Sequence, residues 1–353
     1  MKILILAGGK GTRLWPISRE ESPKQFQKFL SKKSLLQEAF NRLRPYFALR
    51  DLYIVTNQGY REEVQKQLPQ LPRKNIIIEP ASCNTAAAIG LGAVYLKKRG
   101  FMNELMVVVP ADHFIKNSPK LIEILKLAEK KFKKDWLGTI GANPSYPETG
   151  YGYIKMGKNL GNNFFQVEKF IEKPDFETAK QFLTSWEYLW NTGIFIWRVS
   201  TILERIKKYL PGNYKALEKI MLAIGSAEEE KITREEYAKM KDISIDYGVM
   251  EKEKNIVVIP ADIGWSDVGS WFHLRNALQK EKDSNVVKGK HIGVDSNNSL
   301  IFGSSRLIAT VGVKDLVVVD TDDVLFICPI DQSQNVKKLI AKMKEEEENQ
   351  KYL

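Results

Sequence analysis

The residues best suited to chemistry in this chain lie in a glycine-rich loop near the N-terminus. The loop follows the apolar run 3–5 and contains Gly8, Gly9 and Gly11, with the cations Arg13 and Lys24 close behind. Backbone N–H groups beside glycines can approach phosphate oxygens, and cations neutralise polyphosphate charge. The pattern predicts a nucleoside triphosphate site. Its expected contacts are Leu6, Ala7, Gly8, Gly9, Gly11, Thr12, Arg13 and Lys24.

Two common phosphate-loop motifs are excluded. The Rossmann fingerprint requires a small residue where Leu14 follows Gly9 and Gly11, and no acidic ribose partner follows a second strand at the usual spacing. The nearest approach to a Walker A motif ends at Gly157 and Lys158, but Asn159 stands where Ser or Thr is needed. The loop therefore belongs to neither class.

Separated motifs in consistent order resemble the mannose-1-phosphate guanylyltransferases, a family of nucleotidyltransferases that make nucleotide sugars. They are LAGGKGTRLWP at 6–16, PKQF at 23–26, FIEKP at 170–174, WNTGIF at 190–195 and GWSDVGSW at 264–271. The resemblance runs from residue 1 to about 275, with a shorter C-terminal match. It implies Mg²⁺-assisted transfer of GMP from GTP to α-D-mannose 1-phosphate, giving GDP-mannose and pyrophosphate.

In such a reaction a sugar-phosphate oxygen attacks the α-phosphorus of GTP in line. The second pKa of a phosphate monoester is about 6, so no general base is required. Arg13 and Lys24 are the expected clamps for the β- and γ-phosphates, where leaving-group charge accumulates. The alternative is two surface cations that pair with Glu20 and Glu21.

Two aspartates from distant parts of the chain are candidate metal ligands. Asp112 follows the apolar run 107–110, and Asp267 lies in the turn at 264–271. Two carboxylates can anchor Mg²⁺, which takes its other ligands from water and phosphate. The resemblance assigns the metal to these positions. Spacing alone leaves open that Asp267 caps the following helix and that Asp112 is a turn residue.

Sugar-phosphate contacts are expected from the middle of the chain. The resemblance assigns Lys173 to the phosphate, while Glu172 and Asn191 offer the acceptors and amide that a hydroxyl-rich ligand needs. Gly150 and Gly152 allow close approach to the ring. Taken alone, residues 172–174 also fit an exposed strand end, and residues 191–193 an ordinary turn.

Recognition of the base is expected near the end of a third apolar run. Glu79, or backbone carbonyls near Pro80, can accept hydrogen bonds from the N–H groups of guanine. Asn84 and Thr85 are expected to cap the alanine-rich helix at 86–99 and to touch the base.

The elements that must position these residues alternate regularly. Strands are predicted at 3–6, 52–56, 75–79 and 105–110, and helices near 34–43, 59–68, 84–99 and 118–134. This alternation predicts an α/β fold with a Rossmann-like, mostly parallel mixed sheet, which the resemblance identifies as the nucleotidyltransferase fold. Ligands of open sheets collect at the carboxyl ends of strands, where the loop, Glu79 and Asp112 stand.

The sequence pattern changes near residue 283, which predicts two domains, a catalytic one at 1–282 and a C-terminal one at 283–353. Short Val/Ile runs there are broken by Gly, Asn and Ser, and the resemblance implies a small left-handed β-helix-like domain. A helix is expected from about Asn335, with residues 345–348 fraying. Because this domain offers β-edges and an amphipathic helix but no convergent charges, we expect it to support association rather than chemistry. The resemblance implies that the partner is a second subunit, which gives a homodimer. The chain ends too early for the isomerase domain of longer family members, so isomerase activity is expected to be absent.

Composition excludes several classes. The 353 residues are 43% hydrophobic and 27% charged, with a net charge of +11. Lysines are interspersed with acids, so a basic surface that favours anionic substrates is expected rather than nucleic-acid binding. No run is long enough for a membrane span, which predicts a cytoplasmic protein. Cys83 and Cys328 provide neither a disulfide framework nor a zinc site.

Two other functions remain open from the sequence. One is transfer to another sugar 1-phosphate or from a nucleotide with another base. The other is a catalytically silent paralogue that binds nucleotide sugars. Against it stands the presence of all the expected charged site residues: Arg13, Lys24, Asp112, Lys173 and Asp267.

Overall fold

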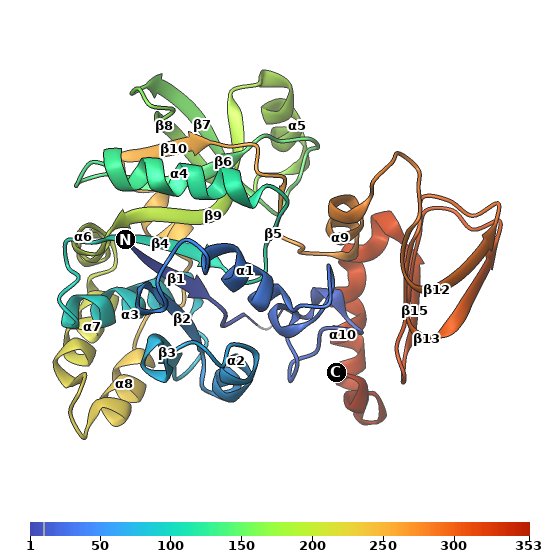
Figure 1. Cartoon of the computed structure of the whole chain (residues 1–353), viewed down its shortest axis with the longest axis horizontal. Coiled ribbons are helices and arrows are strands. Elements are labelled where there is room, and N and C mark those ends of the chain that lie inside the picture. The colour runs from blue at the N-terminus through green and yellow to red at the C-terminus, as the bar shows by residue number, and fades with distance from the viewer. Residues whose placement is uncertain (10) are drawn as a thin grey trace. The chain divides into compact units, whose positions relative to one another are not determined.

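The computed structural model describes residues 1–9 and 11–353, so Lys10 of the loop lies outside the described residues. The chain forms two compact units (Figure 1). The larger contains Met1–Gly8, Ala39–Ala111 and Ile115–Gly264, and the smaller contains Gly9–Glu38, Asp112–Phe114 and Trp265–Leu353. The segment that carries Gly11, Arg13 and Lys24 therefore belongs to the same unit as the C-terminal strands.

The larger unit is built on one mixed sheet. Within the described residues its nine strands have the order β3-β2-β1-β4-β9-β6-β10-β8-β7. They are β1 (Lys2–Leu6), β2 (Leu52–Asn57), β3 (Ile76–Glu79), β4 (Leu105–Pro110), β6 (Leu137–Ala142), β7 (Gly152–Asn159), β8 (Phe165–Glu172), β9 (Tyr188–Arg198) and β10 (Ile256–Pro260). Strands β1 to β4 pair in parallel, as do β6 and β10. Strands β7, β8 and β9 join antiparallel. The predicted mixed α/β sheet is confirmed.

Helices accompany the strands as the alternation predicts. They are α1 (Leu35–Leu43), α2 (Arg61–Gln67), α3 (Asn84–Lys98), α4 (Ser118–Lys131), α5 (Phe176–Ser185), α6 (Val199–Tyr209), α7 (Pro211–Ala223) and α8 (Glu229–Tyr237). Ile3, Leu4 and Ile5 of β1 are fully buried, as expected for a parallel strand covered on both faces. A Cβ at Gly92 of α3 would lie 2.5 Å from Leu4 Cδ2, so the glycine allows this helix to lie directly against β1.

The smaller unit contains the short strands predicted beyond residue 283. They form a sheet in the order β12 (Val286–Val294), β13 (Leu300–Val311), β14 (Leu316–Asp320) and β15 (Leu325–Pro329). Helices α9 (Trp271–Leu278) and α10 (Val336–Glu345) accompany it, and β5 (Phe114–Ile115) pairs with β11 (Trp265–Ser266). Residues 345–348 are exposed, as expected, but the chain continues in a 3-10 helix at Glu347–Tyr352. Across 1–9 and 11–353, no helix combines the length and apolar character needed to cross a membrane.

One apolar core joins the two ends of the chain inside the smaller unit. Trp271 of α9 is fully buried, and its ring packs edge-on against Phe29 and Phe302. The Trp271 indole N–H donates to the Trp15 carbonyl (2.9 Å), and the Trp15 indole N–H donates to the Tyr352 carbonyl (2.7 Å). The N-terminal segment is therefore built into the C-terminal core.

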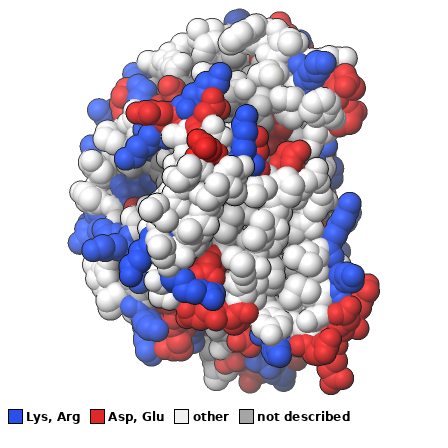
Figure 2. Space-filling model, turned by 90° about the vertical axis from the view of Figure 1, so that its right-hand side faces the viewer, with Lys and Arg blue, Asp and Glu red and all other residues white. Residues whose placement is uncertain are grey.

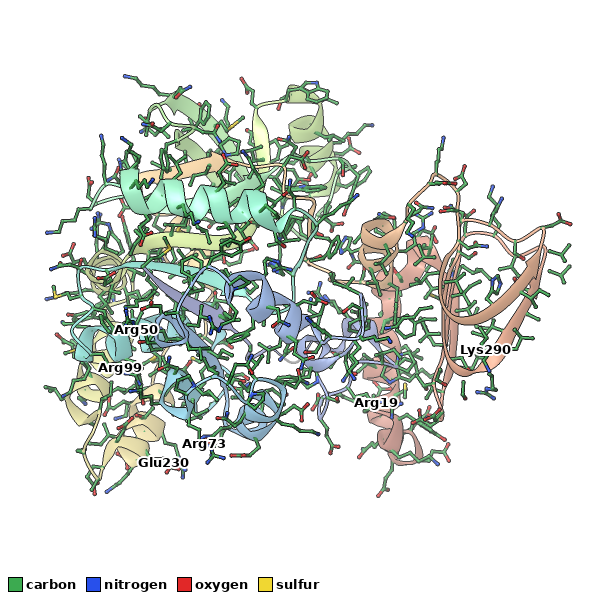
Figure 3. The ribbon with its side chains drawn as sticks, viewed as in Figure 1. Arg19, Arg50, Arg73, Arg99, Glu230 and Lys290 are labelled. Atoms are coloured by element: carbon green, nitrogen blue, oxygen red, sulfur yellow. The ribbon has the colours of Figure 1, made fainter. Side chains whose placement is uncertain are left out.

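An ion pair reinforces this attachment at the surface. Both terminal nitrogens of Arg19 donate to the carboxylate of Asp323, at 2.8 and 2.7 Å; Figure 3 labels Arg19. The geometry is bidentate, which is the strong form of an arginine–carboxylate contact. The C-terminal elements thus hold the segment that carries Lys24, and their expected role in association stays a prediction.

Candidate active site

The first half of the glycine loop is held by the end of β2. Thr56 Oγ1 donates to the Ala7 carbonyl (3.0 Å), and Asn57 Nδ2 donates to the Gly8 carbonyl (2.7 Å). A Cβ at Gly8 would lie 3.3 Å from Glu79 Oε2, so glycine leaves room for that carboxylate. Leu6, Ala7 and Gly8 thus stand at the carboxyl end of β1, the place where an open sheet binds ligands.

The second half of the loop lies over Lys24. Gln25 Nε2 donates to the Gly9 carbonyl (2.8 Å). Gly11 has a φ of 54°, and a Cβ there would lie 2.7 Å from Lys24 Cγ. A left-handed backbone and a close contact therefore both require glycine at this position. Thr12 and Arg13 follow in a 3-10 helix, Thr12–Leu14. Among the residues that the structure describes, the Arg13 side chain has no hydrogen bond or ion pair, which leaves its guanidinium available to an anion.

Lys24 joins three segments of the smaller unit. Its Nζ lies 2.9 Å from Asp112 Oδ2 and 2.8 Å from the Asp267 carbonyl, and it also reaches the Val268 carbonyl at 3.4 Å. Lys24 is 5% exposed, so the predicted alternative of a surface cation paired with Glu20 and Glu21 is wrong for this residue. Three protein oxygens therefore surround this ammonium and hold its charge in place.

The two predicted metal-binding aspartates meet around this lysine. Burial alone would raise the pKa of Asp112, but the charge of Lys24 lowers it below its usual value, with a smaller effect of His113. The negative charge of Asp267 acts on the same carboxyl in the opposite direction, so the two carboxylates are close enough to interact. Asp112 is therefore an ionised acceptor at neutral pH.

The turn around Asp267 is shaped for this contact. Asp267 Oδ1 accepts from the Gly269 N–H (2.8 Å) and lies 3.1 Å from His273 Nδ1. Val268 has a φ of 48°, which is an outlier for a β-branched residue. The alternative that Asp267 caps α9 is wrong, because Ser270 is the N-cap and accepts from the His273 N–H (3.3 Å). The sequence did not single out His273, which is buried beside the carboxylate.

The predicted sugar-phosphate residues come together in the larger unit. Lys173 Nζ lies 2.7 Å from Glu172 Oε1, and Lys173 has a φ of 50°, a strained value for a residue that is not glycine. A Cβ at Gly152 would collide with Glu172 Oε2 and lie 3.3 Å from Asn191 Cβ. Gly150 differs: its N–H donates to Glu148 Oε1 (2.7 Å), a buried carboxylate that the sequence did not indicate.

Glu79 is a buried carboxyl at the end of β3, beside Gly8. Burial raises its pKa to about 7, and the hydroxyl of Tyr237 lowers it in part. Glu79 is 5% exposed, so a protonated side chain can donate a hydrogen bond and an ionised one can accept. Tyr237 lies far along the chain from Glu79, which is why sequence spacing did not reveal it.

The predicted cap at Asn84 and Thr85 is wrong. Helix α3 begins at Asn84, and its N-cap, Cys83, makes no side-chain capping bond. Thr85 Oγ1 instead accepts from the Ile245 N–H (2.8 Å), which ties the start of α3 to a distant turn. Asn84 has a φ of 60°, and its Oδ1 accepts from the Thr85 N–H (2.9 Å).

Replacement of Glu79 by glutamine is expected to change how stability depends on pH. The folded pKa of about 7 lies above the ordinary value of 4.5, so the folded chain retains a proton that the unfolded chain has released between these values. This contribution to stability is complete below about pH 4.5 and falls by about 3 kcal/mol as pH rises through 7. Urea unfolding of both proteins at pH 5 and pH 8 measures the difference. If the free energy of unfolding changed by the same amount between pH 5 and pH 8 in both proteins, the raised pKa of Glu79 would be contradicted.

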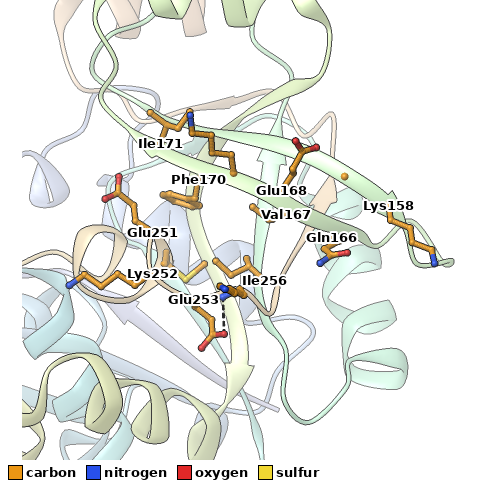
Figure 4. Close-up of a pocket in the computed structure, with 14 residues that line it drawn as sticks. Lys158, Gln166, Val167, Glu168, Phe170, Ile171, Glu251, Lys252, Glu253 and Ile256 are labelled. Atoms are coloured by element: carbon orange, nitrogen blue, oxygen red, sulfur yellow. Dashed lines mark hydrogen bonds between the residues drawn. The ribbon is translucent and has the colours of Figure 1, made fainter.

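A groove elsewhere in the larger unit holds none of the predicted site residues. It is lined by residues 157–158 of β7, by residues 166–171 of β8 and by residues 250–254 and 256, with Lys158, Glu168 and Lys252 among its side chains (Figure 4). Its charges are mixed, so it shows no preference for an anionic or a cationic ligand.

Comparison with known proteins gives a consistent result. A nucleotidyl transferase family model matches residues 2–284, and a MannoseP isomerase/GMP-like beta-helix domain model matches residues 289–343, which confirms the predicted β-helix-like C-terminal domain. A mannose-1-phosphate guanylyltransferase of Salmonella muenchen is 38% identical over 355 residues, covering 98% of this chain and 74% of that protein.

Solved structures agree on the architecture. A crystal structure described as a mannose-1-phosphate geranyltransferase from Thermus thermophilus aligns with a TM-score of 0.89 and 31% identity, covering 97% of this chain and 99% of that one. A mannose-6-phosphate isomerase from Helicobacter pylori aligns with a TM-score of 0.61 and 26% identity, over 75% of this chain and 100% of that one. The extent of these matches shows that the chain belongs to the nucleotidyl transferase family and, within it, to the mannose-1-phosphate guanylyltransferases.

Proposed function

We propose that this chain transfers GMP from GTP to α-D-mannose 1-phosphate, giving GDP-mannose and pyrophosphate. The observation that carries the proposal is the junction at Lys24, where one buried ammonium joins the glycine loop to Asp112 and Asp267. Identity of 38% to a mannose-1-phosphate guanylyltransferase supports this substrate pair.

The residues suit a reaction that needs charge neutralisation rather than proton transfer. An oxygen of the sugar phosphate forms a bond to the α-phosphorus, and the bond from that phosphorus to the bridging oxygen breaks, so pyrophosphate leaves with the electron pair. Arg13 and Lys24 are proposed to neutralise its charge, and Lys173 to hold the attacking phosphate. The fixed acceptors around Lys24 provide the preorganisation that such electrostatic catalysis requires.

Asp112 and Asp267 fit a magnesium site. Their side chains are 30% and 17% exposed, and their charges interact. In the described part of the chain, no three His, Cys, Asp or Glu side chains are grouped to hold a metal, so the remaining ligands would be phosphate and water. Bound Mg²⁺ would supply positive charge to the phosphate oxygens.

Asp112→Asn and Asp267→Asn are each expected to raise the Mg²⁺ concentration at half-maximal rate about tenfold or more, because each replaces an anionic oxygen by a weaker amide ligand. Asp262→Asn, at an exposed position, is the matched control. Titration of initial rate with Mg²⁺ measures the effect. Unchanged half-saturation in both variants would remove this pair from metal binding.

A pyrophosphate-release screen tests the function itself. Each of several nucleoside triphosphates is combined with each of several sugar 1-phosphates, and GTP with mannose 1-phosphate is expected to be fastest. A faster pair would assign another sugar or base. Binding of GDP-mannose without turnover of any pair would identify a silent paralogue.

We also propose that the chain forms a homodimer through its C-terminal strands. Several large apolar side chains of β12, β13 and β15 are exposed: Val287, Ile292, Val294, Leu307, Val311, Leu325 and Ile327. Figure 2 shows a face on which uncharged side chains form a broad area between charged ones. Such apolar surface favours a protein cover, here a second copy of the chain.

A further inference from the structure

Asp246 lies beside the proposed sugar-binding residues, although it comes from a distant part of the chain. It is the first residue of a π-helical turn, Asp246–Met250. Such turns are rare in proteins, and those that occur are often at functional sites. Its Oδ1 accepts a hydrogen bond from Asn191 Nδ2 (2.8 Å), 55 positions earlier in the chain. The sequence motifs did not include this residue.

Hydrogen bonds to protein groups fix the orientation of the Asn191 amide, with its nitrogen toward Asp246. Its Oδ1 accepts from Thr139 Oγ1 (2.9 Å) and from the Gly193 N–H (3.2 Å), so both lone pairs of this oxygen already have protein donors. One amide proton binds Asp246, which leaves one free donor. Asn191 is therefore better suited to positioning the Asp246 carboxylate than to accepting bonds from sugar hydroxyls.

Glu172 presents an unused acceptor in the same place. Its side chain is 9% exposed, and Oε1 is taken by Lys173 Nζ (2.7 Å). Oε2 is buried and has no hydrogen-bond partner among the described residues. It lies over Gly152, where any side chain would collide with it. A buried acceptor without a partner is costly, so this oxygen points to a ligand that donates a hydrogen bond.

The charged groups near Asp246 are Glu172 and Lys173, whose effects on it are opposite. Burial, followed by the charge of Glu172, raises the pKa of Asp246 to about 7, and Lys173 and the Asn191 bond act against this. The aromatic ring of Tyr247 lies 5.9 Å from Lys173 Nζ. Glu251 faces the same segment through a bond from the Glu172 N–H (3.1 Å). The two carboxylates present acceptor oxygens, which suit the uncharged hydroxyl groups of a sugar ring.

We propose that Asp246 is a sugar-binding residue that accepts a hydrogen bond from a ring hydroxyl, next to a second hydroxyl bound by Glu172. This inference rests on the proposed function, because it assumes a hexose 1-phosphate as the ligand. Asn191 then acts as a positioning residue for Asp246.

Asp246→Asn tests the proposal and keeps the acceptor for Asn191. It is expected to raise the KM for mannose 1-phosphate about tenfold or more, as for loss of a hydrogen bond to a charged group, while the KM for GTP stays unchanged. Asp242→Asn, exposed and four positions earlier, is the matched control. An unchanged KM for mannose 1-phosphate in Asp246→Asn overturns the proposal.

Monodeoxy mannose 1-phosphates identify the contact. One analogue is expected to lose about tenfold in kcat/KM with the wild-type enzyme and nothing further with Asp246→Asn, because both changes remove the same bond. If the losses from the analogue and from Asp246→Asn were additive for every analogue, Asp246 would act only through the fold. If Asp246→Asn abolished Mg²⁺ binding in calorimetry, the residue would belong to a cation site. Either result overturns the proposal. Failure of the wild-type enzyme to use mannose 1-phosphate would refute the proposed function instead, which separates the two.

Discussion

Replacement of Lys24 by methionine is expected to lower kcat about 100- to 1,000-fold, the effect of removing one preorganised charge from a developing anion. The proposed role places this ammonium near the departing pyrophosphate, so its loss acts mainly in the transition state. Methionine keeps most of the apolar stem that packs against Gly11. The measurement is steady-state kinetics with GTP varied at saturating mannose 1-phosphate.

The same substitution is also expected to lower the stability of the fold, and this effect must be distinguished from the loss of kcat. Asp112 loses its cation and the Asp267 carbonyl loses a donor, at about 1 to 3 kcal/mol in the free energy of unfolding. Lys28→Met, at an exposed position four residues later, is the matched control and should leave kcat unchanged. Near-normal turnover in folded Lys24→Met would assign Lys24 to holding Asp112 and Asp267 together and to no step of the reaction.

Truncation after Lys282 is expected to lower kcat/KM about 100-fold or more, because small displacements of groups that bind the reactants have effects of that size. The deletion removes Phe302 and the Tyr352 carbonyl from the core around Trp15 and Trp271, and it removes the partner of Arg19. The segment that carries Lys24 then loses its support. The sheet of the larger unit has its own core, so its strand and helix content should survive in circular dichroism.

A surface substitution separates this effect from association. Leu307 of β13 is 61% exposed, and Leu307→Asp should weaken the proposed dimer while activity remains. Light scattering at micromolar concentration reports the mass of both proteins. A truncated chain with full activity would mean that the C-terminal elements do not position the loop, and an inactive monomeric Leu307→Asp would tie activity to association.

The first half of the sheet could be predicted from the sequence. The apolar runs that predict β1 to β4 are long and bounded by helical patterns, and parallel strands buried on both faces leave this signal in any sequence. The antiparallel insertion of β9 between β4 and β6 was not predicted. It depends on contacts between residues about 50 to 90 positions apart, which no local periodicity records.

The residue types of the candidate site were also accessible from the sequence. Glycines beside cations, paired aspartates and the Glu172-Lys173 pair have chemical meaning at short range, and the family resemblance orders them along the chain. Their partners were not accessible. His273 beside Asp267, Tyr237 beside Glu79 and Asp246 beside Asn191 became visible only in three dimensions.

By itself the sequence determined which charged and flexible groups are available for chemistry, because side-chain charge and glycine content are local properties. Tertiary structure decided which groups share an environment. It buried Lys24 between Asp112 and the Asp267 turn, and it packed the loop segment onto the C-terminal strands. The physical reason is that burial and electrostatic interaction depend on distance in space, and the chain folds residues more than 200 positions apart to within 3 Å of one another.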